Sequence, residues 1–183
     1  MAGVYSSTIS CLNPALQINS MQKPSAAVAI IKSLTPEKSF LVIRRAVHPD
    51  DPWSGHFSFP GGRKEDTDRD LLATCIRETR EEVGITLSEN RLHSILPVTT
   101  VGKNLNFEIV VQPFLFELPK QPPLILNPHE VQKSCWINAR DFLDRTRHRE
   151  IEMIPGTMFP AFPLGDYFLW GFTYKILRSI LEM

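Results

Sequence analysis

The stretch that most constrains this chain runs from Phe59 to Ile85, where a glycine pair precedes a helix-like segment rich in acids. Glu78, Glu81 and Glu82 fall within an arc of about 100° on an α-helix, at roughly 100° per residue. The apolar side chains of the same segment form a separate stripe, so one helix face is expected to pack on a core. Three like charges converging on one point favour a hard cation, which takes oxygen ligands. The segment therefore predicts a packed helix that presents a metal site.

Residues at both ends of this segment favour a helix with defined limits. Thr67, Asp68 or Asp70 can cap its N-terminus, because a short polar side chain accepts a hydrogen bond from a free backbone N–H. Gly84 is expected to end it as a left-handed residue just past the last turn. Arg77 precedes Glu81 by four residues, one helical turn, and is expected to orient it.

The segment resembles the Nudix box, whose pattern is G-x5-E-x7-R-E-U-x-E-E-x-G-U with U aliphatic. Gly62 matches its first glycine, and the run from Arg77 to Ile85 matches its second half. Asp68 stands at the first glutamate and Thr79 at the first aliphatic position, and eight residues rather than seven separate Asp68 from Arg77. The longer spacing, and S-F-P-G-G at 58–62, are similar to the coenzyme A pyrophosphatase branch. The upstream signature of that branch is matched only loosely at 41–45.

This resemblance implies an α/β (α+β) Nudix fold, with a mixed β-sheet sandwiched between α-helices, over about residues 24–181. We expect an N-terminal extension at 1–22 and a Nudix hydrolase domain at 23–183. Local patterns predict a hairpin at 26–31 and 40–45, a loop at 46–55 and a short strand at 56–59. Further on they predict strands at 92–101, 107–118 and 130–137, a surface loop at 119–128, a helix at 139–143 capped by Asn138, an irregular segment at 145–165 and a C-terminal helix at 168–181.

The resemblance also implies the chemistry: hydrolysis of a nucleoside diphosphate linked to another group, with one to three Mg²⁺ or Mn²⁺ ions. The implied metal ligands are Glu78, Glu81 and Glu82, with the backbone of Gly61 as a further ligand. A loop without side chains lets backbone approach a metal or phosphate closely. The implied catalytic residues are Glu78, Glu81, Arg77 and Glu130, with Arg77 in an orienting role.

The general base is left open between a box glutamate and an acid on a later loop. Glu130, at the start of the predicted strand at 130–137, is the first loop candidate. Glu108 is the second, although it opens a strand and its side chain can simply face water.

Candidate substrate contacts lie outside the box. Arg44 and Arg45 are neighbours on a predicted strand, so they point to opposite faces and at most one is expected to face the site. Trp53 can stack on a base or pack under its own loop. Arg147 and Arg149 belong to a basic cluster at 145–149 that suits an extra phosphate, such as the 3′-phosphate of coenzyme A, although charge runs are often only solvated.

The leading functional hypothesis is hydrolysis of coenzyme A or an acyl-CoA to a phosphopantetheine product and 3′,5′-ADP. One alternative keeps the reaction but replaces the substrate by ADP-ribose, a nucleotide sugar or a (deoxy)nucleoside triphosphate. A second alternative is a non-catalytic nucleotide-binding regulatory module, against which the three glutamates argue.

Composition narrows the expected partners to a small-molecule nucleotide. Twenty basic and twenty acidic residues balance, which argues against a non-specific nucleic-acid binder. No stretch reaches the length of a transmembrane helix, so no membrane partner is expected. Three widely spaced cysteines form no disulfide framework, and the N-terminus resembles no signal or transit peptide, so we expect a cytoplasmic location. The choice between monomer and homodimer stays open.

Overall fold

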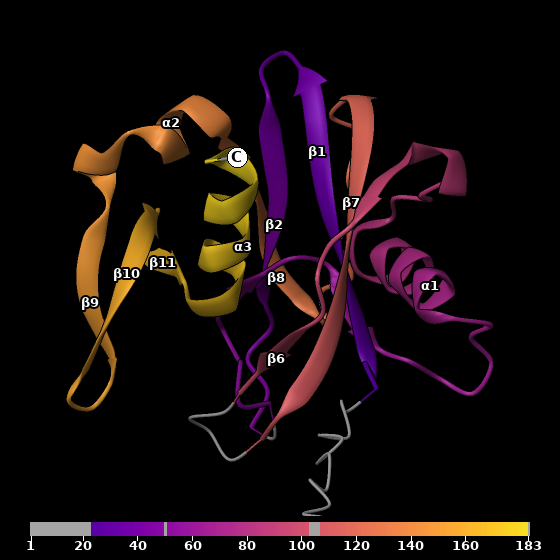
Figure 1. The fold of residues 1–183 in the computed structure, drawn as a ribbon, viewed down its shortest axis with the longest axis horizontal. Helices are drawn as coiled ribbons and strands as arrows, with labels where there is room; N and C mark the ends of the chain where they lie inside the picture. The colour runs from indigo at the N-terminus through magenta and orange to yellow at the C-terminus, as the bar shows by residue number, and fades with distance from the viewer. Residues whose placement is uncertain (1–22, 50, 103–106, 183) are drawn as a thin grey trace, which may run out of the picture.

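A computed structural model describes residues 23–49, 51–102 and 107–182 of the chain. It has a layered arrangement, with helix α1 (Leu71–Val83) on one side of a large β-sheet. On the other side lie α2 (Ala139–Leu143), α3 (Gly171–Leu181) and a second, smaller sheet (Figure 1). The predicted mixed sheet between helices is therefore confirmed. The expected extension at 1–22 lies outside the described residues.

The main sheet is built around β1 (Ala26–Thr35), which runs parallel to β7 (Ile109–Lys120) and antiparallel to β2 (Ser39–Arg45). The β1–β2 pair is the predicted hairpin. Within the described residues this sheet has eight strands, in the order β3-β2-β1-β7-β5, with β4 beside β1, β6 beside β7 and β8 beside β2. The remaining strands are β3 (Phe57–Ser58), β4 (Gly61–Arg63), β5 (Leu92–Ile95), β6 (Thr99–Val101) and β8 (Val131–Asn138).

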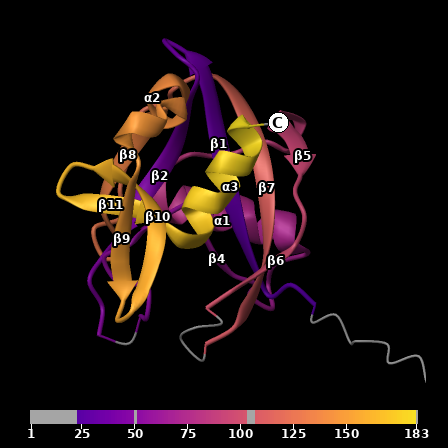
Figure 2. The ribbon, with the colours of Figure 1, turned by 60° about the vertical axis from the view of Figure 1, so that its left-hand side comes forward.

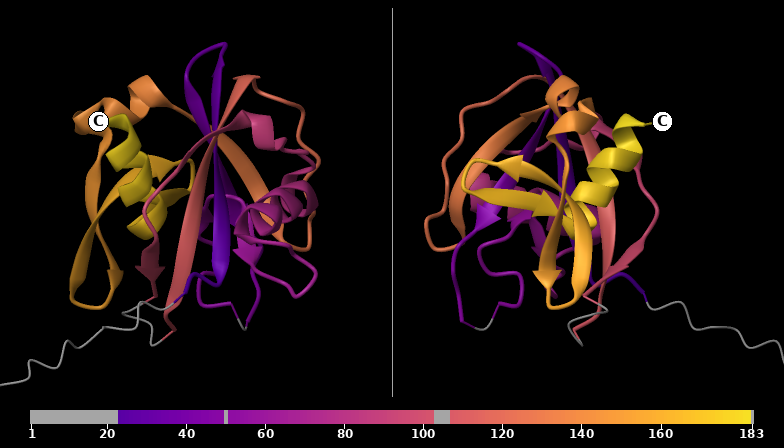
Figure 3. Two further views of the ribbon diagram at one scale, coloured as in Figure 1. Left: turned by 45° about the vertical axis from the view of Figure 1, so that its right-hand side comes forward. Right: turned by 90° about the vertical axis from the view of Figure 1, so that its left-hand side faces the viewer.

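Alternating side chains of β1 divide the core into two parts. Ala27, Ala29 and Ile31 pack with α1 residues such as Cys75. Ile30 instead packs with residues of α2 and α3, including Leu177. Successive side chains of a strand point to opposite faces, so both faces of this strand are buried. The left view of Figure 3 shows α1 and α3 on opposite sides of the main sheet.

Both ends of α1 follow the predicted chemistry. Asp70 is the N-cap, and its side chain accepts a hydrogen bond from the Ala73 N–H at 2.8 Å. Gly84 ends the helix in the left-handed conformation, with φ of 73°, and its N–H bonds to the Arg80 carbonyl. Asn138 caps α2 in the same way as Asp70 caps α1. In the described ranges, no helix combines the length and apolar character needed to cross a membrane.

Two predictions about the strands and the C-terminal helix were wrong. The run at 92–101 is broken into β5 and β6 around Pro97, and a 3₁₀ turn, η1 (Glu89–Arg91), precedes it. Of the predicted helix at 168–181, the first three residues belong to a strand, and α3 begins at Gly171.

The segment at 145–165, predicted as irregular, is mostly β-structure, so that prediction was also wrong. It contains the turn η3 (Arg145–Arg147) and strands β9 (Arg149–Ile154) and β10 (Thr157–Leu164), and β11 (Tyr167–Trp170) completes a small antiparallel sheet. Figure 2 shows these strands beside α2 and α3. Phe162 and Leu164 lie two residues apart in β10, so both side chains point into the core. The burial of these two side chains outweighs the unfavourable effect of the neighbouring prolines on strand formation.

Candidate active site

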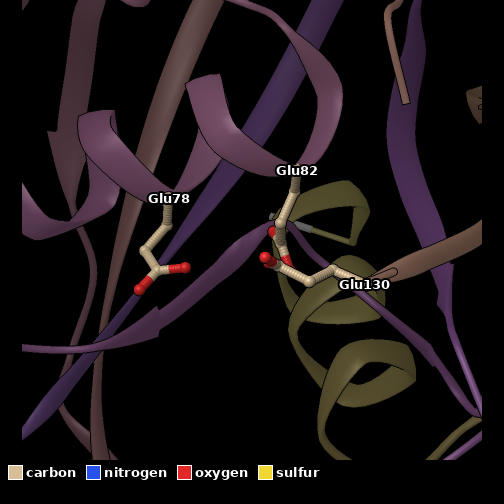
Figure 4. A group of neighbouring side chains, drawn as sticks. All are labelled: Glu78, Glu82 and Glu130. Carbon is tan, nitrogen blue, oxygen red and sulfur yellow. The ribbon is translucent and has the colours of Figure 1, made fainter. Parts of the chain in front are cut away.

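Three acids, Glu78, Glu82 and Glu130, form a cluster that we call the glutamate group. One carboxylate oxygen of each lies within 4.8 Å of one from each of the others. Figure 4 shows Glu78 and Glu82 extending from neighbouring turns of α1, with Glu130 reaching toward Glu82 from the loop before β8. Acids far apart in the sequence therefore meet at one place.

Glu82 is the most buried member of the group, with 3% of its surface exposed. Burial raises the pKa of its carboxyl to about 8, while the Gly61 N–H and the charge of Arg45 act in the opposite direction. The Gly61 N–H donates to Oε2 of Glu82 at 2.8 Å, which fixes the orientation of the carboxylate. Burial also raises the pKa of Glu78, against the nearby charge of Arg77. A buried acid among other acids lacks charge compensation, which a bound cation would supply.

The two glycines before the helix make this close packing possible. A Cβ on Gly62 would lie 2.4 Å from the carboxyl carbon of Glu78. A Cβ on Gly61 would lie 2.2 Å from the carbonyl oxygen of Ala27, and its φ of 148° also disfavours a side chain. The backbone of β4 therefore lies directly against the acids. The role of Gly61 as a metal ligand through its carbonyl stays a prediction.

Arg77 is anchored by Asp68, a contact that sequence reasoning missed. Asp68 is 7% exposed and accepts from Nε and Nη2 of Arg77 at 3.0 and 2.9 Å, and from the Thr74 hydroxyl at 2.9 Å. These contacts, among which the hydrogen bonds from Arg77 have the largest effect, hold the pKa of Asp68 well below its usual range. The contact with Asp68 also raises the pKa of Arg77. The available signal was the place of Asp68 at the first glutamate of the Nudix pattern. Sequence reasoning placed Asp68 at that position and offered it as a helix cap, but did not predict its contact with Arg77.

Glu81 is held differently from its two neighbours on α1. Nη1 of Arg77 donates to Glu81 at 2.9 Å and to Glu78 at 3.0 Å. The Glu81 side chain is 42% exposed, and the glutamate group does not include it. Arg77 thus contacts Glu81, as its spacing predicts. The assignments of Glu81 as ligand and catalytic residue stay predictions.

Glu130 is positioned by its own loop and by the end of β2. Its Oε1 accepts from Nδ2 of Asn127 at 3.0 Å, and its carbonyl accepts from the Ala46 N–H at 2.8 Å. Glu108, the second candidate base, is exposed and stands outside the glutamate group. The geometry therefore favours Glu130 over Glu108 as the loop acid.

Arg44 and Arg45 occupy opposite sides of β2, as neighbours on a strand must. Arg45 lies close enough for its charge to lower the pKa of Glu82, and its Nε donates to Asp51 at 2.7 Å. Arg44 instead donates to the Gly55 carbonyl and to Asp166, each at 2.8 Å. Arg45 is thus the one of the pair associated with the glutamate group.

The other proposed substrate residues, Trp53, Arg147 and Arg149, contact residues outside the glutamate group. Trp53 packs against Phe107, with ring centroids 5.4 Å apart. Arg147 pairs with Asp141 at 2.7 Å and lies over the ring of Phe162, on the α3 side of the sheet. Arg149 donates to the carbonyls of Thr146 and His148. The structure thus places Arg147 and Arg149 in the layer opposite α1, and their role in phosphate binding stays a prediction.

The donor set of the glutamate group fits a hard divalent cation. Its ligands are carboxylate oxygens, which suit Mg²⁺ or Mn²⁺, and the burial of Glu82 adds a need for positive charge.

Comparisons with known proteins agree with this site and fold. The NUDIX domain family model matches residues 23–156. An uncharacterized Nudix hydrolase of Yersinia pestis, NudL, is 28% identical over 160 residues, covering 86% of this chain and 78% of the relative. An uncharacterized protein of Schizosaccharomyces pombe is 36% identical over 107 residues, which cover 56% of this chain but only 32% of that relative.

A solved structure extends the comparison to almost the whole chain. The Nudix domain of Shewanella oneidensis NrtR, solved with ADP ribose, superposes with a TM-score of 0.58 at 15% identity, covering 94% of this chain and 93% of that one. At this identity the match shows the fold alone. With the family model matching most of the chain, the protein belongs to the Nudix family. Its similarity to a Nudix hydrolase supports a pyrophosphohydrolase.

Proposed function

We propose that this chain is a metal-dependent pyrophosphohydrolase that cleaves the diphosphate linkage of a nucleoside diphosphate derivative. The observation that carries the proposal is the convergence of Glu78, Glu82 and Glu130 within 4.8 Å. Such a group has a use in phosphoryl chemistry, because a diphosphate needs positive charge to be bound and attacked. A purely structural cluster would gain nothing from burying Glu82 beside two other acids.

Glu78 and Glu82 of the glutamate group would hold Mg²⁺ or Mn²⁺, with Glu81 as a further proposed ligand. When bound, the ion neutralises diphosphate charge and lowers the pKa of a water molecule. Water adds to one phosphorus, the bridging P–O bond breaks, and two phosphate monoesters leave with release of a proton. Glu130 is the proposed proton acceptor, since it is the exposed acid of the group and reaches it from a loop.

Two arginines have separate tasks in this proposal. Arg77 orients Glu78 and Glu81 by donating a hydrogen bond to each carboxylate. Asp68 fixes the guanidinium group of Arg77 by accepting a further hydrogen bond from it. Arg45 offers positive charge to a substrate phosphate, because its side chain is 32% exposed and lies near Glu82.

Coenzyme A or an acyl-CoA is the substrate that we propose first. It is supported by the aspartate spacing of the box and by the S-F-P-G-G run before it. ADP-ribose is the second candidate, because a Nudix domain of the same fold, that of NrtR, was solved with ADP ribose.

The test is a substrate panel with Mg²⁺ or Mn²⁺ at alkaline pH, with products resolved by mass. The panel contains coenzyme A, dephospho-CoA, ADP-ribose, a nucleotide sugar and a nucleoside triphosphate. Cleavage of the diphosphate in any of them, abolished by EDTA and in Glu82→Gln, supports the reaction class, and the preferred compound names the substrate. No cleavage across the panel, or full turnover in EDTA, would refute the proposal.

A further inference from the structure

Three side chains that the proposed reaction does not use form a second cluster, which we call the Trp53 platform: Trp53, Phe107 and Arg63. The rings of Trp53 and Phe107 lie 5.4 Å apart at an interplanar angle of 56°. The guanidinium of Arg63 lies over the Phe107 ring, 5.3 Å from its centroid. Phe107 is 41% exposed, and Trp53 is half-buried against the core. Two aromatic rings and a planar cation thus reach the surface together.

The Trp53 platform is linked to the glutamate group along two short paths. Arg63 directly follows Gly62, whose backbone lies against the Glu78 carboxylate, and its carbonyl accepts from Nη2 of Arg77 at 3.2 Å. On the second path, Asp51 accepts from Nε of Arg45 through one oxygen and from the Trp53 N–H, at 3.0 Å, through the other. Arg45, which is proposed to bind phosphate, is therefore connected to the Trp53 platform through Asp51. Arg77 is connected to the platform through the carbonyl of Arg63.

A second aromatic cluster, around Tyr167, differs in one respect. Arg44 lies over the ring of Tyr167, 4.6 Å from its centroid, but is only 15% exposed and is bonded to Gly55 and Asp166. That cation is committed to holding the smaller sheet on the main one. Arg63 is exposed and has no acidic partner among the described residues, so its charge is available to a ligand.

We propose that the Trp53 platform is the subsite that binds the nucleobase of the substrate by stacking. This inference rests on the proposed function, because it assumes a nucleotide whose phosphates lie at the glutamate group. Every nucleobase has an aromatic face, and stacking on aromatic side chains and arginine is tolerant of base identity. The platform therefore gives affinity for a nucleoside rather than selectivity among bases.

The experiment measures binding of AMP and of ribose 5-phosphate, which lacks the base, by calorimetry in the presence of Mg²⁺. Trp53→Leu and Phe107→Leu are expected to weaken AMP binding by about 5- to 150-fold, the effect of removing one stacking partner. Both should leave ribose 5-phosphate within about twofold of wild type. Trp53→Phe keeps an aromatic ring, so its AMP affinity should stay close to that of wild type.

Intrinsic tryptophan fluorescence gives a second readout that does not depend on catalysis. AMP should quench the wild-type emission, and Trp53→Phe should remove most of that quenching. Trp170→Phe is the matched control, since Trp170 belongs to the other aromatic cluster with His56, and it should keep the quenching. Melting temperatures confirm that each variant is folded.

Unchanged AMP affinity in folded Trp53→Leu and Phe107→Leu would overturn the inference. An equal loss for AMP and ribose 5-phosphate would also overturn it, because the base would then contribute nothing. Since the readout is binding, a chain that binds AMP through Trp53 but cleaves no diphosphate would refute the proposed function and support this subsite.

Discussion

The two faces of the main sheet both carry arginines among acids, but the charges are arranged differently. On the α1 face, three acids converge within 4.8 Å, and one arginine, Arg77, contacts several carboxylates. On the α3 face, Arg147 pairs with Asp141, and Arg145 pairs with Glu182 at 2.9 Å while 77% exposed. Exposed single pairs contribute little energy and compensate their own charge. A candidate site is therefore marked by charges that converge and are only partly compensated, rather than by many charges in one stretch of sequence.

The largest effect is expected from removing one of the three converging negative charges on the α1 face. Glu82→Gln keeps the shape and the Gly61 hydrogen bond but removes one negative charge, so kcat should fall on the order of 10²- to 10⁴-fold. Glu182→Gln, on the α3 face, is the matched control and should leave kcat unchanged. Steady-state kinetics with saturating Mn²⁺ decide the matter. Native kcat in Glu82→Gln would mean that the glutamate group holds no catalytic metal.

Glu81 sharpens the same comparison, because its carboxylate is bonded to Arg77 and lies outside the glutamate group. If it serves as a ligand, Glu81→Gln should lower kcat by about tenfold or more and weaken Mn²⁺ binding. Titration of activity against free Mn²⁺ measures both. A variant with native kcat and native Mn²⁺ dependence would restrict the ligands to the glutamate group.

The next effect is on stability rather than catalysis. Asp68→Ala removes the buried partner of Arg77 and should cost about 2–4 kcal/mol, since breaking a buried pair leaves polar groups unsatisfied. For a domain of this size, Tm should fall by about 4–16 °C. Glu65→Gln is the control, because Glu65 also pairs with Arg77, but at 3.6 Å and 62% exposed. Equal Tm changes in the two variants would show that burial of Asp68 adds nothing.

A smaller effect separates Arg44 from Arg45, neighbours that belong to different faces. Arg44→Ala should cost about 1–3 kcal/mol of stability, because it ends two hydrogen bonds to the loop and the smaller sheet. Arg45→Ala should instead lower kcat/KM by about 10- to 100-fold, as expected for a lost phosphate contact. Thermal melts and steady-state kinetics on both variants test whether Arg44 acts mainly in stability and Arg45 mainly in catalysis. Equal catalytic losses would place both arginines in substrate binding.

Local patterns predicted the parts of the fold that short stretches of sequence determine. The helix that carries Glu78 and Glu82 has Asp70, one of the three expected caps, and Gly84 at its ends. Its spacing predicted that Glu78, Glu81 and Glu82 share a face, but only Glu78 and Glu82 belong to the glutamate group. The meeting with Glu130 depends on the pairing of β2 with β8, which no local pattern contains. The resemblance to the family suggested an acid on a later loop, for which Glu130 was the first candidate, and the tertiary structure brings Glu130 to the α1 acids.

The smaller sheet shows why the remainder was missed. The proline-rich segment at 145–165 was predicted as irregular, but the pairing of β10 with β9 and β11 and the burial of Phe162 outweigh its prolines. With no regular structure predicted there, the basic cluster at 145–149 was expected to suit a substrate phosphate. In the structure, Arg147 and Arg149 lie in a layer supported by that sheet.

The smallest expected effect tests that placement directly. Because Arg147 is paired with Asp141 and lies over Phe162 on the α3 side, Arg147→Ala should change KM for coenzyme A and for dephospho-CoA by less than about twofold. The two substrates differ by the 3′-phosphate, so the ratio of their KM values isolates its recognition. Loss of a charged contact would instead change that ratio by about 5- to 150-fold. A change of that size in Arg147→Ala or Arg149→Ala, with native Tm, would show that the basic cluster takes part in substrate binding. It would also show that a nucleotide bound at the glutamate group reaches around the sheet to its other face.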